Sequence, residues 1–280
     1  MDCTQPTKQD KKARDFLDYV YHIAGLIKAY RQADYDRVNS LATKYLIEAV
    51  TEANNKNLKR FLYLSSLAAV GPAEDINGVN EESPCRPVSH YGKSKLKGEL
   101  IVRQYKDILP VTILRPPPVY GPRDTGLLFF FQITSRGIKP QFCARKYISL
   151  LYIDDLVDAI ILSAENSRSI GQVYFVANTE CYSINSIIDI ISKVINNGNV
   201  ITLRIGDWAV RGFAGLYEGA CYLFGLEPSI INNQKAIELS QNYWTCQSEK
   251  IKIDIGFKPK SLLEKGIQET ADWYLRNKWI

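Results

Sequence analysis

The sequence predicts an α/β protein in which a parallel sheet is covered by helices on both faces. Short apolar runs (DYVYHIAG, RFLYLSS and VTILRPP) alternate with segments whose apolar residues recur every three or four positions. Continuous apolar runs are typical of parallel strands that are buried on both faces, and alternation with helices is typical of strand–helix–strand units. We therefore expect buried strands at 18–25, 60–66 and 111–117.

The intervening helices follow from the same periodicity. Residues 34–54 carry apolar side chains at spacings of three and four, which predicts a helix with one buried face. The remaining expected elements are a helix at 91–105, a helix at 154–166, a strand at 172–178, a helix whose N-cap is Ser183, and an amphipathic helix at 261–277.

Composition and charge argue against several classes of protein. The net charge is +5, and the basic run at 8–14 contains an aspartate, so we interpret that run as a solvated helix face and expect no nucleic-acid partner. The six cysteines form no CxxC pair and there are two histidines, so neither a metal site nor a disulfide framework is expected. We expect free thiols, a cytoplasmic location and, without an apolar run of 18 residues, no membrane span.

The candidate chemistry begins with Tyr91 and Lys95 in the segment SHYGKSKLKGEL. Residues four apart share one face of a helix, and a nearby ammonium favours the phenolate form of a tyrosine. An ordinary tyrosine has a pKa of about 10, so a base that works near neutrality needs a shift of roughly 3 units. The spacing alone also fits a solvated helix face, because Tyr274 and Lys278 repeat it.

Ser66 distinguishes the Tyr91–Lys95 pair from the Tyr274–Lys278 pair. It ends the strand RFLYLSS, 25 residues before Tyr91, whereas Tyr274 has no such partner. Ligands of α/β proteins bind at the carboxyl ends of parallel strands. Ser66 alone is compatible with an ordinary turn serine, but together with Tyr91 and Lys95 it predicts a catalytic group.

Five motifs occur in order between Val20 and Ile160: VYHIAG, SSLAAVGP, YGKSK, LRPPPVYGPRD and YIDDLVDAI. As a set they resemble the extended short-chain dehydrogenases/reductases, the NAD-dependent epimerase/dehydratase superfamily. The resemblance implies a Rossmann-like, doubly wound parallel sheet with NAD or NADP as cofactor. It also implies that Tyr91 is the acid/base, that Lys95 tunes it and holds the nicotinamide ribose, and that Ser66 binds the reacting oxygen.

The resemblance also implies which residues line the cofactor. Asn39, in RVNSLAT, matches an asparagine of a family helix. No metal ligand is implied. The implied cofactor-binding residues are Asp2, Cys3, Ile23, Ala24, Gly25, Tyr91, Lys95, Pro116 and Val119.

The glycine loop of the family has no counterpart in this sequence. The family opens with a strand and a GxxGxxG turn that cradles the pyrophosphate, yet Gly25 is the one glycine before Gly71. We therefore expect a sheet without its first strands and with an exposed edge, from an incomplete reading frame or, less favoured, a short variant that has lost cofactor binding. On either interpretation, we expect these 280 residues alone to bind NAD(P) poorly or not at all.

We expect two domains. Residues 1–122 and 148–180 would form the incomplete NAD(P)-binding domain, and 123–147 and 181–280 a smaller, mostly helical substrate subdomain. The apolar segment 205–226 fits either a lid over a hydrophobic substrate or simple packing of that subdomain. The family resemblance also implies a homodimer through the helices that follow Asp34 and Tyr91.

Pro118 bears on the reaction. Nucleotide-sugar epimerases of the superfamily often carry an asparagine just before VYG, where this chain has Pro118. Together with SSLAAVG, the RP-rich motif resembles the 3β-hydroxysteroid dehydrogenase and flavonol-reductase branches instead. This resemblance favours an alcohol/ketone oxidoreductase acting on a small hydrophobic molecule, for example a steroid-like one. The alternatives are a nucleotide-sugar epimerase or dehydratase and a non-catalytic truncated or vestigial protein.

Overall fold

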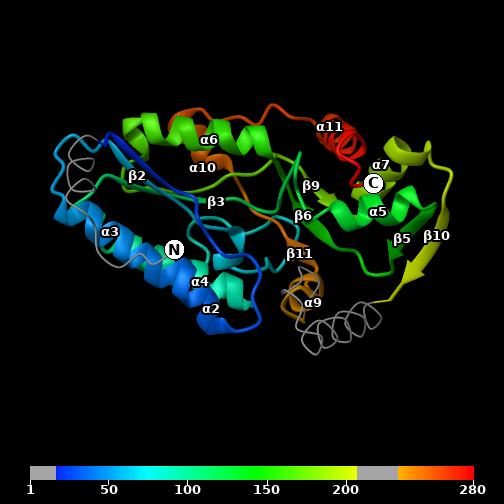
Figure 1. Ribbon diagram of the computed structural model, residues 1–280, viewed down its shortest axis with the longest axis horizontal. Coiled ribbons are helices and arrows are strands. Elements are labelled where there is room, and N and C mark those ends of the chain that lie inside the picture. Colours follow the sequence, from blue (N-terminus) through cyan, green and yellow to red (C-terminus); the bar gives the residue numbers. More distant parts are fainter. Residues whose placement is uncertain (1–16, 207–232) are drawn as a thin grey trace.

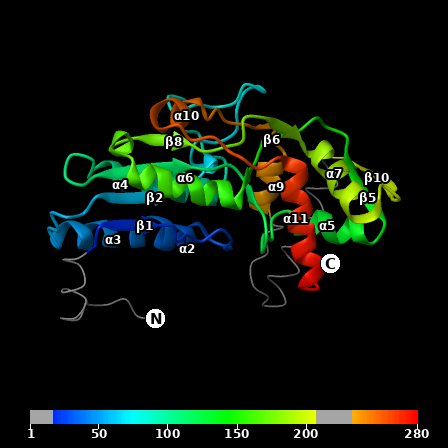
Figure 2. The same ribbon diagram turned by 90° about the horizontal axis from the view of Figure 1, so that it is seen from above.

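The computed structural model describes residues 17–206 and 233–280, and a four-stranded parallel sheet is its central feature (Figure 1). Every neighbouring pair is parallel, and the order along the sheet is β1-β2-β3-β8. Figure 2 shows β1 and β8 at opposite edges. The α/β, Rossmann-like prediction is thus confirmed. The strands are β1 (Tyr19–His22), β2 (Arg60–Leu64), β3 (Val111–Arg115) and β8 (Val173–Phe175).

Helices cover both faces of this sheet, as the apolar runs predict (Figure 1). Successive side chains of a strand point to opposite faces. Accordingly, Phe61 and Tyr63 of β2 pack in the core beneath two helices, while Leu62 packs in the core of the other face. The helices on the first face are α3 (Ala42–Glu52) and α4 (His90–Arg103), and those on the second are α6 (Ile153–Glu165) and α10 (Glu249–Ile255).

Strand β1 departs from the prediction of a fully buried strand. Within the described residues it pairs with β2 alone, and Tyr21 and Ile23 are 40% and 49% exposed. An edge strand has a neighbour on one side only, so its side chains lose less contact with solvent. Apolar content therefore located the strand correctly but overestimated its burial.

A π-helical turn interrupts the first long helix. Helix α2 (Gln32–Asp36) continues through this turn, Arg37–Leu41, into α3. Asn39 lies in the turn and is buried; its carboxamide accepts from Leu26 N at 2.6 Å and donates to Leu26 O and Ser94 Oγ, both at 2.9 Å. Single π-turns occur frequently at functional sites. Here Asn39 ties the segment after Gly25 to α4.

Helix α4 lies unusually close to the end of β2. Ser89 caps it, with its Oγ accepting from Gly92 N at 3.1 Å. A Cβ atom at Gly92 would overlap the Ala68 carbonyl, and one at Gly98 would come within 2.6 Å of Asn39 O. These glycines let the helix face that carries Tyr91 and Lys95 approach the strand end.

The other described elements form a second group around α11 (Figure 2). Ser183 caps α7 as predicted, accepting from Ser186 N at 3.0 Å. Three small sheets pair β4 (Val119–Tyr120) with β7 (Leu151–Tyr152), β5 (Ile138–Phe142) with β10 (Ile201–Ile205), and β6 (Tyr147–Ser149) with both β9 (Cys181–Ser183) and β11 (Tyr243–Trp244). The helices are α5 (Leu128–Ser135), α7 (Ile184–Asn196), α9 (Asn233–Leu239) and α11 (Leu263–Arg276).

Tyr274, the second tyrosine with a lysine four residues later, belongs to this group. It is fully buried in an aromatic cluster, and its hydroxyl donates to Asp124 O at 2.6 Å. The interpretation as a solvated helix face is wrong for this pair, because the tyrosine belongs to the core of the helix packing.

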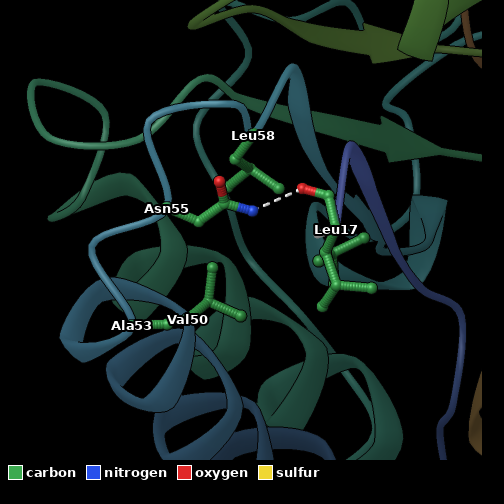
Figure 3. Close-up of a pocket in the computed structure, with 6 residues that line it drawn as sticks. Leu17, Val50, Ala53, Asn55 and Leu58 are labelled. Carbon is green, nitrogen blue, oxygen red and sulfur yellow. Dashed lines mark hydrogen bonds between the residues drawn. The ribbon is translucent and has the colours of Figure 1, made fainter. Parts of the chain in front are cut away.

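A small apolar pocket lies at the amino ends of β1 and β2 (Figure 3). It is lined by Leu17, Val50 and Leu58 among others, and Asn55 Nδ2 donates to Leu17 O at 2.7 Å. Parallel sheets bind ligands at the opposite, carboxyl ends of their strands, so this pocket is not the candidate site. Among the described residues, no helix is long and apolar enough to cross a membrane, and no cluster of metal-ligating side chains occurs.

Candidate active site

The carboxyl end of β2 brings Ser66 and Tyr91 together. Ser66 follows the strand in extended conformation, and its Oγ accepts from Ala68 N at 3.1 Å. Tyr91 is the second residue of α4, and it lies close enough to Ser66 for that side chain to lower the pKa of the tyrosine hydroxyl. Two of the three predicted catalytic residues therefore meet, although 25 positions separate them in the sequence.

Lys95 lies one helical turn further along the same face. Its Nζ donates to Leu64 O at 2.5 Å and sits 4.5 Å from the centroid of the Tyr63 ring. Burial lowers the pKa of Lys95 to about 8, and the carboxylate of Glu99 opposes that shift. The lysine is therefore anchored to the strand end while remaining mostly protonated at neutral pH.

The electrostatics of Tyr91 favour its neutral form. Burial raises the pKa of Tyr91 to about 12, even though the hydrogen bond with Ser66 lowers it. Glu238 of α9 and Tyr35 add to the upward shift. The ammonium of Lys95, directed at the Leu64 carbonyl, does not outweigh burial, so Tyr91 is a proton donor rather than a phenolate in this structure.

Sequence reasoning missed a buried group beside these residues. Ser65 Oγ donates to Glu99 Oε1 at 2.5 Å, and Arg115 Nη2 donates to Glu99 Oε2 at 2.7 Å. Glu99 follows Lys95 by four residues, so helical spacing was a usable signal for it. Arg115 could not be found in this way, because its contact depends on how β2 and β3 lie beside each other.

Three predicted cofactor-binding residues lie together after β1. Ile23, Ala24 and Gly25 are exposed at the carboxyl end of that strand. A Cβ atom added to Gly25 would lie 3.6 Å from Lys95 Nζ and 3.3 Å from Asn39 Oδ1. Glycine therefore keeps the approach to Lys95 open, and this part of the chain fits the nicotinamide ribose of a dinucleotide.

The other predicted cofactor residues are less informative. Pro116 is buried and its carbonyl accepts from Leu67 N at 2.8 Å, so it braces the end of β2. Val119 opens β4 and packs against the core beneath α6. Asp2 and Cys3 lie outside the described residues, as does most of the segment 205–226.

The residues after β1 fit the pyrophosphate of a dinucleotide less well than its nicotinamide ribose. A phosphate loop needs glycines that let backbone N–H groups approach the ligand, and Gly25 is the one glycine among residues 17–70. The described residues thus match one end of the cofactor and offer no glycine-rich turn for its centre.

His22, at the end of β1, makes the stability of the fold depend on pH. Burial, together with the ammonium of Lys95, lowers the pKa of His22 from 6.5 to about 4. Between those values the unfolded chain binds a proton that the folded chain does not. We expect stability to be complete above pH 6.5 and to fall by up to about 3 kcal/mol as the pH drops towards 4.

Urea unfolding between pH 7 and pH 4.5 measures this dependence. In the native chain His22 Nε2 lies 2.8 Å from Thr43 Oγ1, and a glutamine at this position can still hydrogen-bond to Thr43. The variant His22→Gln should therefore lose the histidine's contribution to the pH dependence of the unfolding free energy. The control is His90→Gln at the other histidine, which is not fully buried. Equal slopes for the two variants would contradict the assignment to His22.

Comparisons with known proteins agree with this geometry. The family model described as "NAD dependent epimerase/dehydratase family" matches residues 1–177. The ceramide reductase of Caulobacter vibrioides is 27% identical over 281 residues, covering 100% of this chain and 80% of that protein. The UDP-glucose 4-epimerase of Vibrio cholerae is 23% identical over 248 residues, covering 86% and 70%.

A solved structure confirms the fold. The dTDP-glucose 4,6-dehydratase of Bacillus anthracis, in complex with NAD, superimposes with a TM-score of 0.73 at 20% identity. The superposition covers 97% of this chain and 76% of that one. These comparisons do not single out the 3β-hydroxysteroid dehydrogenase branch. With well over half of its residues matched by the family model, the chain belongs to the NAD-dependent epimerase/dehydratase family of enzymes.

Proposed function

We propose that this chain is an NAD(P)-dependent oxidoreductase that interconverts an alcohol and a ketone at Ser66, Tyr91 and Lys95. The observation that carries the proposal is that Ser66 and Tyr91 lie together at the carboxyl end of β2, with Lys95 anchored to the same strand end beside the exposed Gly25. Bound NAD(P) would supply or accept the hydride.

The residues have distinct roles in the reduction of a ketone. Tyr91, neutral at physiological pH, donates its hydroxyl proton to the carbonyl oxygen. Ser66 hydrogen-bonds the same oxygen as negative charge develops on it. The ammonium of Lys95 stabilises the phenolate that Tyr91 becomes, since a nearby positive charge favours the charged form of a tyrosine. In the oxidation of an alcohol the proton returns to Tyr91.

We favour a hydrophobic substrate. Pro118 is exposed just before β4 and has no side-chain group that could hydrogen-bond a sugar. The likeness to a ceramide reductase along the whole chain supports a lipid-like ketone or alcohol, of which a steroid-like molecule is one form. The likeness to UDP-glucose 4-epimerase supports the alternative, a nucleotide-sugar epimerase or dehydratase.

The domain assignment and the homodimer are also proposals. We propose that 1–122 and 148–180 bind the cofactor, and that 123–147 and 181–280 bind the substrate. The side chains of Tyr45 on α3 and Leu100 on α4 are 60% and 53% exposed, which supports pairing of two copies through these helices.

The test separates cofactor binding from chemistry. NADH and NADPH are titrated against the purified chain by fluorescence, and we expect weaker than micromolar affinity because Gly25 is the one glycine before Gly71. Turnover is then followed with a long-chain aliphatic ketone at millimolar NADH and, separately, with UDP-glucose at millimolar NAD⁺, because epimerisation begins with oxidation of the sugar. Oxidation of NADH by the ketone supports the proposal.

Two results would overturn the proposals. Epimerisation of UDP-glucose without turnover of the ketone would replace the oxidoreductase by the alternative function. Turnover of neither substrate, with NADH bound at saturation, would favour the non-catalytic interpretation. Micromolar affinity for NADH would refute the expected weak binding and leave the proposed chemistry standing.

A further inference from the structure

Three consecutive residues at the end of β2 each contact one residue on the same face of α4. The Leu64 carbonyl accepts from Lys95 Nζ at 2.5 Å, and Ser65 Oγ donates to Glu99 Oε1 at the same distance. Ser66 lies close enough to Tyr91 to lower the pKa of the tyrosine hydroxyl. The three helix residues follow each other at intervals of four, which places them in one row. Tyr91 and Lys95 were predicted from the sequence and have roles in the proposed chemistry, but Glu99 has none.

Glu99 is bound on both oxygens. Its side chain is fully buried, and Oε1 accepts from Arg115 Nε at 2.9 Å in addition to Ser65. Oε2 accepts from Arg115 Nη2 at 2.7 Å and lies 3.5 Å from Arg103 Nη2. Paired, doubly hydrogen-bonded geometry of this kind is what allows a carboxylate to be buried. The carboxylate is therefore held rigidly between the ends of β2 and β3.

The charges around Lys95 single out Glu99. The groups that face the ammonium are His22 of β1, Tyr63 of β2 and the Leu64 carbonyl. Tyr91 lies one turn away on α4. Among the ionisable groups of residues 17–206 and 233–280 that act on Lys95, Glu99 is the one that favours its charged form. The same carboxylate that holds Ser65 thus also balances the lysine.

We propose that Glu99 is a positioning residue of the acid/base site: through Ser65 it fixes the end of β2 against α4, and its charge balances the ammonium of Lys95. Ser66 and Leu64 flank Ser65, so a fixed Ser65 sets how both neighbours meet the helix. The consequence for catalysis rests on the proposed function, whereas the hydrogen bond of Glu99 with Ser65 and its electrostatic effect on Lys95 do not.

The experiment measures Lys95 without cofactor or substrate. The chain is labelled with ¹³C at lysine Cε, and the Lys95 signal is identified by its loss in Lys95→Met. In the native chain we expect the signal to titrate with a midpoint at about pH 8, the pKa to which burial lowers Lys95. In Glu99→Gln we expect the midpoint to fall by about one pH unit, because loss of a nearby opposite charge disfavours the ammonium.

Two variants make the result specific. Glu99→Asp keeps the charge, so its midpoint should return close to the native value. The matched control is Glu48→Gln on α3, a partly exposed glutamate paired with Lys44 at 3.7 Å, which should leave the midpoint unchanged. An unchanged midpoint in folded Glu99→Gln would overturn the proposal and assign Glu99 a purely structural role.

A second variant covers the case in which Glu99→Gln fails to fold. Glu99→Gln/Arg115→Met removes both members of the buried pair, and such replacements are often tolerated. Because the Glu99 carboxylate is absent from this variant too, the titration midpoint of Lys95 should again fall. An unchanged midpoint would again overturn the proposal. Since no cofactor is used, failure here is distinguishable from failure of the proposed oxidoreductase activity.

Discussion

Replacing Tyr91 by phenylalanine is expected to lower turnover of the ketone by roughly 100- to 10,000-fold, the usual contribution of one positioned acid or base. The ring would remain packed beside Tyr35, whose centroid is 6.4 Å away. What is lost is the hydroxyl that meets Ser66 and donates the proton. The rate of NADH oxidation at millimolar NADH and saturating ketone measures the effect.

The matched control is Tyr274→Phe, which removes the same atom from the other tyrosine that precedes a lysine by four residues. Tyr274 lies in the aromatic core around α11, and its hydroxyl binds Asp124 O. We expect the Tyr274→Phe variant to turn over the ketone at close to the native rate. Comparable losses in both variants would show that the decrease reflects damage to the fold, and no loss in Tyr91→Phe would place the proton donor elsewhere.

The strands of the central sheet could be predicted because each is a short apolar run. Their ends were less accurate: the expected strand at 111–117 ends at Arg115, since Pro116 and Pro117 cannot donate to a neighbouring strand. The small sheets around β6 were not predicted. Strands of two or three residues carry too few side chains to display a period, and their partners lie far away in the sequence.

The candidate site, too, could be predicted only where local sequence carries the signal. Tyr91 and Lys95 could be predicted from helical spacing, and Ser66 from its place at a strand end. The pKa of Tyr91 could not, because the burial that raises it to about 12 depends on packing from α9 and α2 as well as α4. The contact between Glu99 and Arg115 depends on strand order, which local sequence does not encode.

The largest loss of stability is expected from Arg115→Ala. The Arg115 side chain is 1% exposed and that of Glu99 is fully buried, so the variant leaves a buried carboxylate without its main partner. Removing one member of a buried pair costs about 3–5 kcal/mol. Equilibrium unfolding in urea, followed by circular dichroism, measures the free energy of unfolding and should show a loss in this range.

Arg103→Ala is the matched control, because Arg103 meets the same carboxylate at 3.5 Å while its own side chain is 43% exposed. Partly exposed ion pairs contribute about 1 kcal/mol or less, so this variant should remain close to the native stability. The double variant Glu99→Gln/Arg115→Met should recover most of the loss, since neither charge is then left unpaired. Equal stability of Arg115→Ala and Arg103→Ala would show that apolar packing alone holds the strand ends. The contacts between β2 and α4 would then follow from that packing rather than from the ion pair of Glu99 with Arg115.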